Sequence, residues 1–228
     1  MFDSLINFDH QLLLLINGSH SLYADQLVHI LTTSTTWIPL YVALFWLVLK
    51  NNENACRLFL VVSCAVVCIL LAGTVDDMLV KPFVARYRPT HDPSIGILVD
   101  VVNGYRGGKY GFFSAHAANT FSLAVFFSLV VRKGSFTIMM ICWSLVNCFT
   151  RIYLGVHYPG DIMAGLFWGG FIAWLIWLGY LRLQKLIGHN NKFVSSQYTR
   201  TGYRHADIEI VNTVLCLIYL YAFIRACV

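Results

Sequence analysis

The chain has 228 residues, of which 58% are hydrophobic and only 12% are charged, whereas an ordinary soluble domain carries about 25% charged residues. A mean hydropathy of +0.66 and long apolar blocks exclude an ordinary soluble domain and indicate a membrane protein. The net charge of +5 is modest and unevenly distributed, which argues against a nucleic-acid-binding protein.

Apolar segments follow one another along most of the chain. Residues 5–17 (LINFDHQLLLLIN) are too short to span a bilayer and predict an amphipathic helix at the membrane interface. Longer apolar runs predict transmembrane helices at residues 27–49, 57–80, 112–131, 135–153, 161–181 and 208–224. We therefore expect an all-α fold, an integral-membrane helical bundle of about six transmembrane helices with an N-terminal interfacial helix.

The order of these segments predicts three regions: an N-terminal interfacial segment (1–26), a transmembrane core (27–184), and a basic polar segment with an additional helix (185–228). In the fifth predicted span, Gly165 and Gly169 form a G-x-x-x-G pattern, which is suited to close helix packing. The hydrophilic stretch 81–110 is long for a loop of a compact protein, and such loops are usually functional.

Basic residues indicate how the bundle is oriented in the membrane. With six spans, one set of loops holds nine of them, at positions 50, 57, 132, 133, 182, 185, 192, 200 and 204. The other set holds seven, at positions 81, 86, 88, 106, 109, 151 and 225, and most of these have a competing functional explanation. We therefore expect the 81–110 loop to face away from the cytoplasm.

Four polar residues near the predicted span ends have the chemistry of a phosphate site. Lys81, Arg88 and Arg151 are cations which, if they converge, suit a phosphate dianion and the charge of its transfer transition state. Ser114 can donate one more hydrogen bond. Ionisable groups at the edge of the hydrocarbon are costly, so a functional explanation is favoured over simple interfacial anchoring.

Two histidines and an aspartate complete the predicted site. Asp161 follows His157 by four residues, so its carboxylate can hold one imidazole nitrogen protonated while the other attacks phosphorus. His116 can then protonate the leaving oxygen as a general acid. These three groups are also plausible metal ligands, but three neighbouring cations would repel a divalent ion, so we expect no metal.

Other polar residues of the 81–110 loop are candidates for contacts with an anionic headgroup: His91, Tyr105, Arg106 and Lys109. Solvent exposure is an equally good interpretation for the last three. Asp77 precedes Lys81 by four residues and could orient it, although an ordinary ion pair at a helix end is favoured for Asp76 and Asp77.

The spacing K-x6-R-P, then S-x-H, then R-x5-H-x3-D resembles the motifs of the type 2 phosphatidic acid phosphatase (PAP2) superfamily, over about residues 25–185. The resemblance implies a phosphohistidine on His157 oriented by Asp161, with His116 as acid and with no metal or other cofactor. It also implies phosphate binding by the residues at 81, 88, 114 and 151. Ala115 departs from the glycine usual in the second motif, which puts the shape of the phosphate loop in doubt.

The motifs and the hydropathy together predict a phosphatase of a membrane lipid in a bacterial inner membrane, with its site facing the periplasm. Lipid A phosphate and undecaprenyl diphosphate are the first candidate substrates, followed by phosphatidylglycerol phosphate and phosphatidic acid. Two alternatives stay open: a phosphatase of a soluble phosphate ester, and a non-catalytic protein that binds or transports a lipid phosphate. The sequence predicts no oligomeric state.

Overall fold

The computed structural model describes residues 2–19, 21–52, 54–187 and 196–228, and every regular element within these ranges is a helix. Lys192 and the rest of 188–195, within the polar segment, lie outside the described residues. The α-helices are α1 (Phe2–Ile16), α2 (Leu22–Thr32), α3 (Ile38–Asn51), α4 (Ala55–Val75), α5 (Lys81–Val84), α6 (Ala115–Val131), α7 (Gly134–Tyr153), α8 (Pro159–Leu186) and α9 (His205–Arg225). Short helical turns are η1 (Ser34–Trp37), the π-helical η2 (Asp76–Val80), η3 (Pro89–His91) and η4 (Val102–Gly104).

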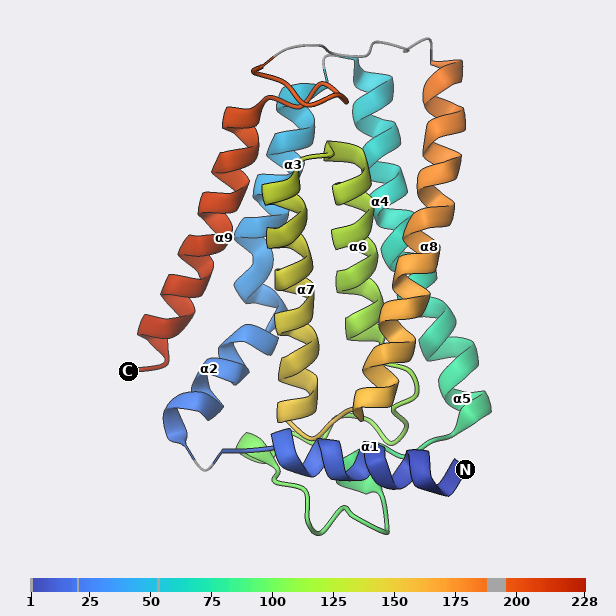
Figure 1. Cartoon of the computed structure of the whole chain (residues 1–228), viewed down its shortest axis with the longest axis vertical. Coiled ribbons are helices and arrows are strands. Elements are labelled where there is room, and N and C mark those ends of the chain that lie inside the picture. Colours follow the sequence, from blue (N-terminus) through green and yellow to red (C-terminus); the bar gives the residue numbers. More distant parts are fainter. Residues whose placement is uncertain (1, 20, 53, 188–195) are drawn as a thin grey trace.

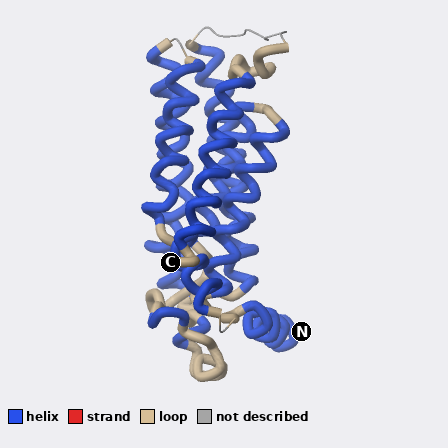
Figure 2. Tube along the Cα trace, turned by 90° about the vertical axis from the view of Figure 1, so that its left-hand side faces the viewer, coloured by secondary structure: helices blue, strands red, loops and turns tan. Residues whose placement is uncertain are grey.

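The long helices form one bundle, and α1 lies across one of its ends (Figure 1). Figure 2 shows the same arrangement from the side, with most of the loop between α5 and α6 gathered at the end where α1 lies. Helix α6 packs against α4, α7 and α8, and its Phe126 joins Trp37, Trp143 and Phe136 in the buried core. This arrangement confirms the predicted all-α bundle and the helix across its end.

The lengths and apolarity of the helices are those of a multi-pass membrane protein. Four segments are long and apolar enough to cross a bilayer by themselves: Ala55–Val84, Gly134–Tyr153, Pro159–Leu186 and His205–Arg225. The bent pair of α2 and η1–α3 makes a fifth, and α6 is an apolar helix of 17 residues beside them. The described residues therefore hold four or five candidate spans where about six were predicted, because α6, the counterpart of the predicted span 112–131, is shorter than the helices that meet the length of a span.

The first predicted span, 27–49, is broken where a continuous helix was expected. Its two halves, Leu22–Thr32 and Ser34–Asn51, meet at 64°. Hydroxyl groups at the break bond to the preceding turn: Thr33 Oγ1 donates to His29 O at 2.7 Å, and Thr36 Oγ1 donates to Ile30 O at 2.7 Å. Such bonds compete with the regular backbone ladder, and Pro39 follows without a backbone donor.

Two glycines of α8 allow it to approach α6 closely. A Cβ on Gly169 would lie 2.4 Å from Ala118 O, and a Cβ on Gly165 would lie 2.7 Å from Ser114 O. The G-x-x-x-G pattern therefore forms the predicted helix contact. Because Ser114 precedes the first turn of α6, this contact also fixes the start of α6 against α8.

Candidate active site

All of the residues predicted for catalysis and phosphate binding lie on segments at the α1 end of the bundle (Figure 1). Lys81 begins α5, Ser114 caps α6 with His116 in its first turn, and Arg151 lies in the last turn of α7. Arg88 and His157 lie in loops, and Asp161 lies in the first turn of α8.

Lys81 is paired with the carboxylates of Asp76 and Asp77. Its Nζ lies 2.8 Å from Asp76 Oδ2 and 2.5 Å from Asp77 Oδ1. Asp76 is fully buried, and its Oδ1 accepts a hydrogen bond of 3.1 Å from the backbone N–H of Phe113. Asp76 therefore connects Lys81 to Phe113, the residue before Ser114. The positive charge of Lys81 is balanced by these two carboxylates.

Arg88, the second cation of the first motif, is held by backbone carbonyls and points at the His157 imidazole. Its Nε donates to Tyr110 O at 3.1 Å, and its Nη1 lies 3.2 Å from Val156 O and 3.1 Å from His157 Nε2. The glycine-rich stretch closes over this side chain, because a Cβ on Gly107 would lie 3.0 Å from Arg88 Nη1. Arg88 has no carboxylate within ion-pair distance in the described part of the chain.

Arg151 is buried and bound by neutral groups. Its Nη1 donates to Thr32 Oγ1 at 2.8 Å, and its Nη2 donates to the Tyr105 hydroxyl at 3.1 Å. Its buried Nε has no hydrogen-bond partner within the described ranges. The two cations without a bound carboxylate at this site are therefore Arg88 and Arg151, and both suit an incoming anion.

Ser114 and His116 lie at the start of α6. The Ser114 hydroxyl oxygen accepts a hydrogen bond of 3.4 Å from Ala117 N, and the Ser114 N–H donates to Asp161 O at 3.1 Å. Ala115 is the first residue of α6 and has no positive φ, so an alanine is accommodated there without strain. His116 lines a cavity of about 160 Å³ together with Ser34, Tyr41, Ile69, Asn119, Thr120 and Leu123.

His157 is 2% exposed and lies between Arg88 and Asp161. Its Nδ1 lies 3.6 Å from Asp161 Oδ2, and that oxygen accepts a hydrogen bond of 3.0 Å from Tyr158 N. Its other nitrogen, Nε2, faces Arg88. The predicted pairing of imidazole and carboxylate is thus present as a close approach, with the opposite nitrogen turned toward a cation.

Burial and charge keep this imidazole neutral. Burial lowers the pKa of His157 well below its ordinary range, and the positive charges of Arg88 and Arg151 act in the same direction. The pKa of Arg88 is also lowered, first by burial and then by Arg151. An anion placed between these groups would relieve both effects, because it favours every positive charge around it.

The structure brings only one of the four predicted headgroup contacts to the site. Tyr105 bonds to Arg151, as described above. His91 Nδ1 lies 3.1 Å from its neighbour Thr90 Oγ1, and Arg106 Nη1 donates to Thr90 O at 3.4 Å. The Lys109 ammonium lies 5.5 Å from the Tyr87 ring centroid and 5.4 Å from that of Tyr110.

Three charged residues at the site did not follow from the sequence. Arg86 lies between Lys81 and Arg88 and pairs with Asp161, its Nη1 donating to Oδ1 at 2.7 Å. Asp9, on α1, accepts from Arg86 Nη2 at 2.6 Å. Asp76 was interpreted as one of an ordinary pair at a helix end. The position of Asp9 within the apolar segment 5–17 could have predicted a charged partner for it, because an unpaired charge in such a segment is costly.

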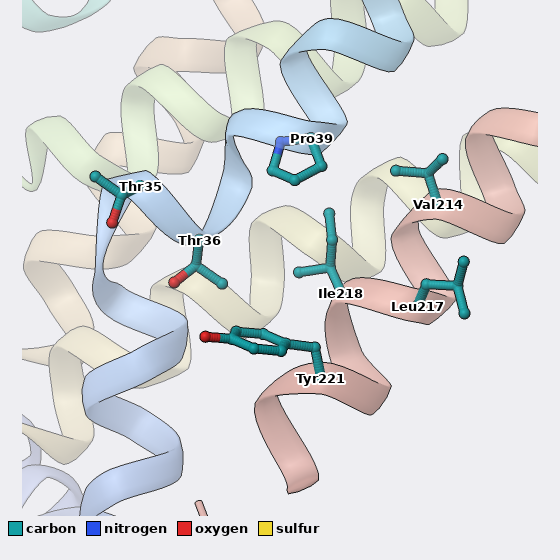
Figure 3. A pocket seen from close by; sticks show the side chains of 7 residues that line it. All are labelled: Thr35, Thr36, Pro39, Val214, Leu217, Ile218 and Tyr221. Atoms are coloured by element: carbon teal, nitrogen blue, oxygen red, sulfur yellow. The ribbon is translucent and has the colours of Figure 1, made fainter. Parts of the chain in front are cut away.

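An apolar groove of about 520 Å³ lies away from these residues, between the break before α3 and the outer face of α9. Figure 3 shows Thr35, Thr36 and Pro39 on one side and Val214, Leu217, Ile218 and Tyr221 on the other. None of the predicted site residues lines it, and it has no group suited to phosphate chemistry.

Comparison with known proteins gives a family match and several relatives. Residues 61–185 match the family model of the PAP2 superfamily. The chain is 36% identical to a lipid A 4'-phosphatase of Bacteroides thetaiotaomicron, over 99% of this chain and 100% of the relative. It is 32% identical to a lipid A 4'-phosphatase of Porphyromonas gingivalis, over 78% of this chain and 75% of the relative. A lipid A 1-phosphatase of Rhizobium etli is 27% identical over 50% of this chain and 48% of its own length. No solved structure matches the chain significantly.

Proposed function

The chain belongs to the PAP2 superfamily of membrane lipid phosphatases, and from this premise we propose that it removes a phosphate group from lipid A through a phosphohistidine on His157. The observation that carries the proposal is the buried His157 imidazole, with one nitrogen facing Arg88 and the other facing Asp161. The choice of lipid A rests on the two lipid A 4'-phosphatases among the relatives, one of which is similar over nearly the whole chain. We accordingly propose the 4'-phosphate as the preferred group.

In the first step, His157 Nε2 attacks phosphorus, and the N–P bond forms while the P–O bond to the lipid breaks. Asp161 faces the Nδ1–H and stabilises the positive charge that the ring gains. The negative charge of the bound phosphate favours protonation of His116, which then gives its proton to the leaving oxygen. In the second step, a water attacks phosphorus and loses a proton to His116, the N–P bond breaks, and inorganic phosphate leaves.

The phosphate group is bound by Arg88 and Arg151, which have no carboxylate partner among the described residues, and by the Ser114 hydroxyl, which accepts from Ala117 N and can donate its proton to phosphate. Lys81 contributes a charge that Asp76 and Asp77 already balance. His116, the proposed acid for the leaving oxygen, lines a cavity of about 160 Å³, so we assign the adjoining sugar or lipid portion of the substrate to that cavity.

Apolar side chains around the site favour a substrate that stays in the membrane. Met78, Leu79 and Phe83 flank Lys81 and are 72%, 65% and 91% exposed. Such a surface is stable only in contact with lipid. The opposite end of the bundle carries Arg57, Arg132 and Lys133 at helix ends, so we propose that this end is cytoplasmic and that the site faces the periplasm of a bacterial inner membrane.

A substrate panel on the purified protein tests the proposal. We expect phosphate release from lipid A carrying both the 1- and 4'-phosphates, with the 4'-phosphate lost first as judged by mass spectrometry of the product. Undecaprenyl diphosphate, phosphatidylglycerol phosphate, phosphatidic acid and a soluble sugar phosphate are compared at equal concentration. Faster hydrolysis of undecaprenyl diphosphate would reassign the substrate, and binding of lipid A without any hydrolysis would favour the non-catalytic alternative.

We further expect activity to survive chelation. Within the described ranges no three His, Cys, Asp or Glu side chains converge as a metal site, and the proposed steps use only side chains. Incubation with EDTA followed by gel filtration should leave the rate of phosphate release within about twofold of the untreated enzyme. A loss that added Mg²⁺ or Zn²⁺ restores would revive the metal interpretation of the two histidines and Asp161.

A further inference from the structure

Helix α1 is attached to the loops that hold the proposed site. Leu13 is fully buried and packs with Tyr158, Ile95 and Val99. At its end, Asn17 Nδ2 donates to Tyr153 O at 2.8 Å and to Asp100 O at 3.0 Å. These contacts join the N-terminal segment to the end of α7 and to the loop before α6, so α1 has a fixed position relative to His157.

One carboxylate of α1 reaches the start of α8. Asp9 Oδ1 accepts a hydrogen bond of 2.8 Å from the backbone N–H of Gly160. A Cβ on Gly160 would lie 2.9 Å from Asp9 Oδ2, so a glycine there permits this approach. The next residue, His10, stacks on the Tyr158 ring with the centroids 5.2 Å apart. Two adjacent residues of α1 therefore contact the segment between His157 and Asp161.

The second oxygen of Asp9 binds a guanidinium that also binds Asp161. Arg86 Nη2 donates to Asp9 Oδ2 at 2.6 Å, and Arg86 Nη1 donates to Asp161 Oδ1 at 2.7 Å. Burial by itself would lower the pKa of Arg86, but Asp161 and Asp9 outweigh it and the pKa is raised. Arg86 therefore remains charged and is oriented by a carboxylate on each side.

This bridge decides which oxygen of Asp161 faces the histidine. Asp161 is fully buried, and Arg86 occupies its Oδ1 while Tyr158 N binds its Oδ2. Only Oδ2 lies near His157 Nδ1, at 3.6 Å. We propose that Asp9 is a positioning residue for the phosphatase reaction, holding Arg86 against Asp161 so that Oδ2 stays aimed at the imidazole. This inference rests on the proposed function of His157.

The bridge also limits the movement of Arg86. An arginine anchored to Asp161 alone would have one Nη group without a carboxylate to hold it. With Asp9 in place, both of its Nη groups are occupied. Loss of Asp9 should therefore affect the chemical step more than the binding of substrate.

Asp9→Asn tests the proposal, because the neutral amide has one acceptor oxygen and cannot accept from both Gly160 N and Arg86, as the carboxylate does. On a lipid phosphate that the wild-type enzyme hydrolyses, we expect kcat to fall about 10-fold or more with KM within about twofold. Gln11→Ala, an exposed position on the same helix, is the matched control and should retain wild-type kcat. Equal kcat for Asp9→Asn and Gln11→Ala would overturn the proposal.

A double-mutant cycle shows whether Asp9 acts through Arg86. The double variant Asp9→Asn/Arg86→Met should be no slower than Arg86→Met alone, within about twofold, because the residue through which Asp9 acts is already absent. Rates that multiply would overturn the proposal. If Asp9→Asn does not yield folded protein, Gly160→Ala tests the same contact by displacing the carboxylate, and a wild-type kcat in that variant is the contrary result. A wild-type enzyme inactive on every lipid phosphate would instead refute the proposed function.

Discussion

Replacement of His157 by alanine is expected to lower kcat for phosphate release by at least about 10³-fold, equivalent to about 4 kcal/mol of transition-state stabilisation. The imidazole is buried between Arg88 and Asp161 and is the nucleophile of the proposed mechanism, in which His116 and Ser114 have other roles. Substrate binding should be less affected, because the cations that hold phosphate are still present. Steady-state rates with the preferred lipid substrate measure the effect.

A trapping experiment identifies the intermediate directly. Wild-type enzyme mixed with substrate labelled in its phosphate and quenched in alkali should carry label on His157, and His157→Ala should carry none. His29→Ala serves as the matched histidine control, because His29 is exposed on α2, and it should keep both the label and the rate. Retained phosphate release by His157→Ala would refute the covalent mechanism.

Replacement of Arg88 by methionine is expected to lower kcat/KM by about 10²–10³-fold, the usual cost of removing a preorganised group that stabilises transition-state charge. Arg88 contacts His157 Nε2, is held by two backbone carbonyls, and has no carboxylate within ion-pair distance among the residues that the structure describes. Methionine fills a similar volume, so the loss reports the charge and the hydrogen bonds. Initial rates over a range of substrate concentrations give kcat and KM separately.

Lysine at position 88 separates charge from geometry. Arg88→Lys restores the cation but lacks the planar fork, so we expect activity between that of Arg88→Met and the wild type. Arg182→Met is the matched control, because Arg182 is exposed near the far end of α8, and it should behave as wild type. An Arg88→Met enzyme with unchanged kcat/KM would remove Arg88 from the phosphate site.

The chain's hydropathy was sufficient to predict the helices, because burial in lipid leaves a long apolar run and few alternatives for the backbone. It did not predict the 64° break in the first span. That break depends on hydroxyl-to-backbone bonds such as Thr33 to His29, and threonine is tolerated in many continuous helices. The threonines could be read from the sequence, but the angle between the two halves of the span could not.

The motif residues were also available from the sequence, since their types and spacing predict phosphate chemistry before any contact is known. What the tertiary structure decided is how their charges are shared. Within the described ranges, Lys81 is paired with two carboxylates and Arg88 with none, a difference that the sequence did not predict.

By itself, therefore, the sequence determined a helical membrane protein of the PAP2 superfamily, and it predicted a nucleophile, an acid and a set of cations from the order of their motifs. Only the folded chain decided that Arg86 joins Asp161 to Asp9, residues 75 and 77 positions away from it. The physical reason is the separation along the chain over which each effect acts. Hydropathy and helical periodicity act between near neighbours along the chain, whereas an ion pair forms wherever packing brings two charges together.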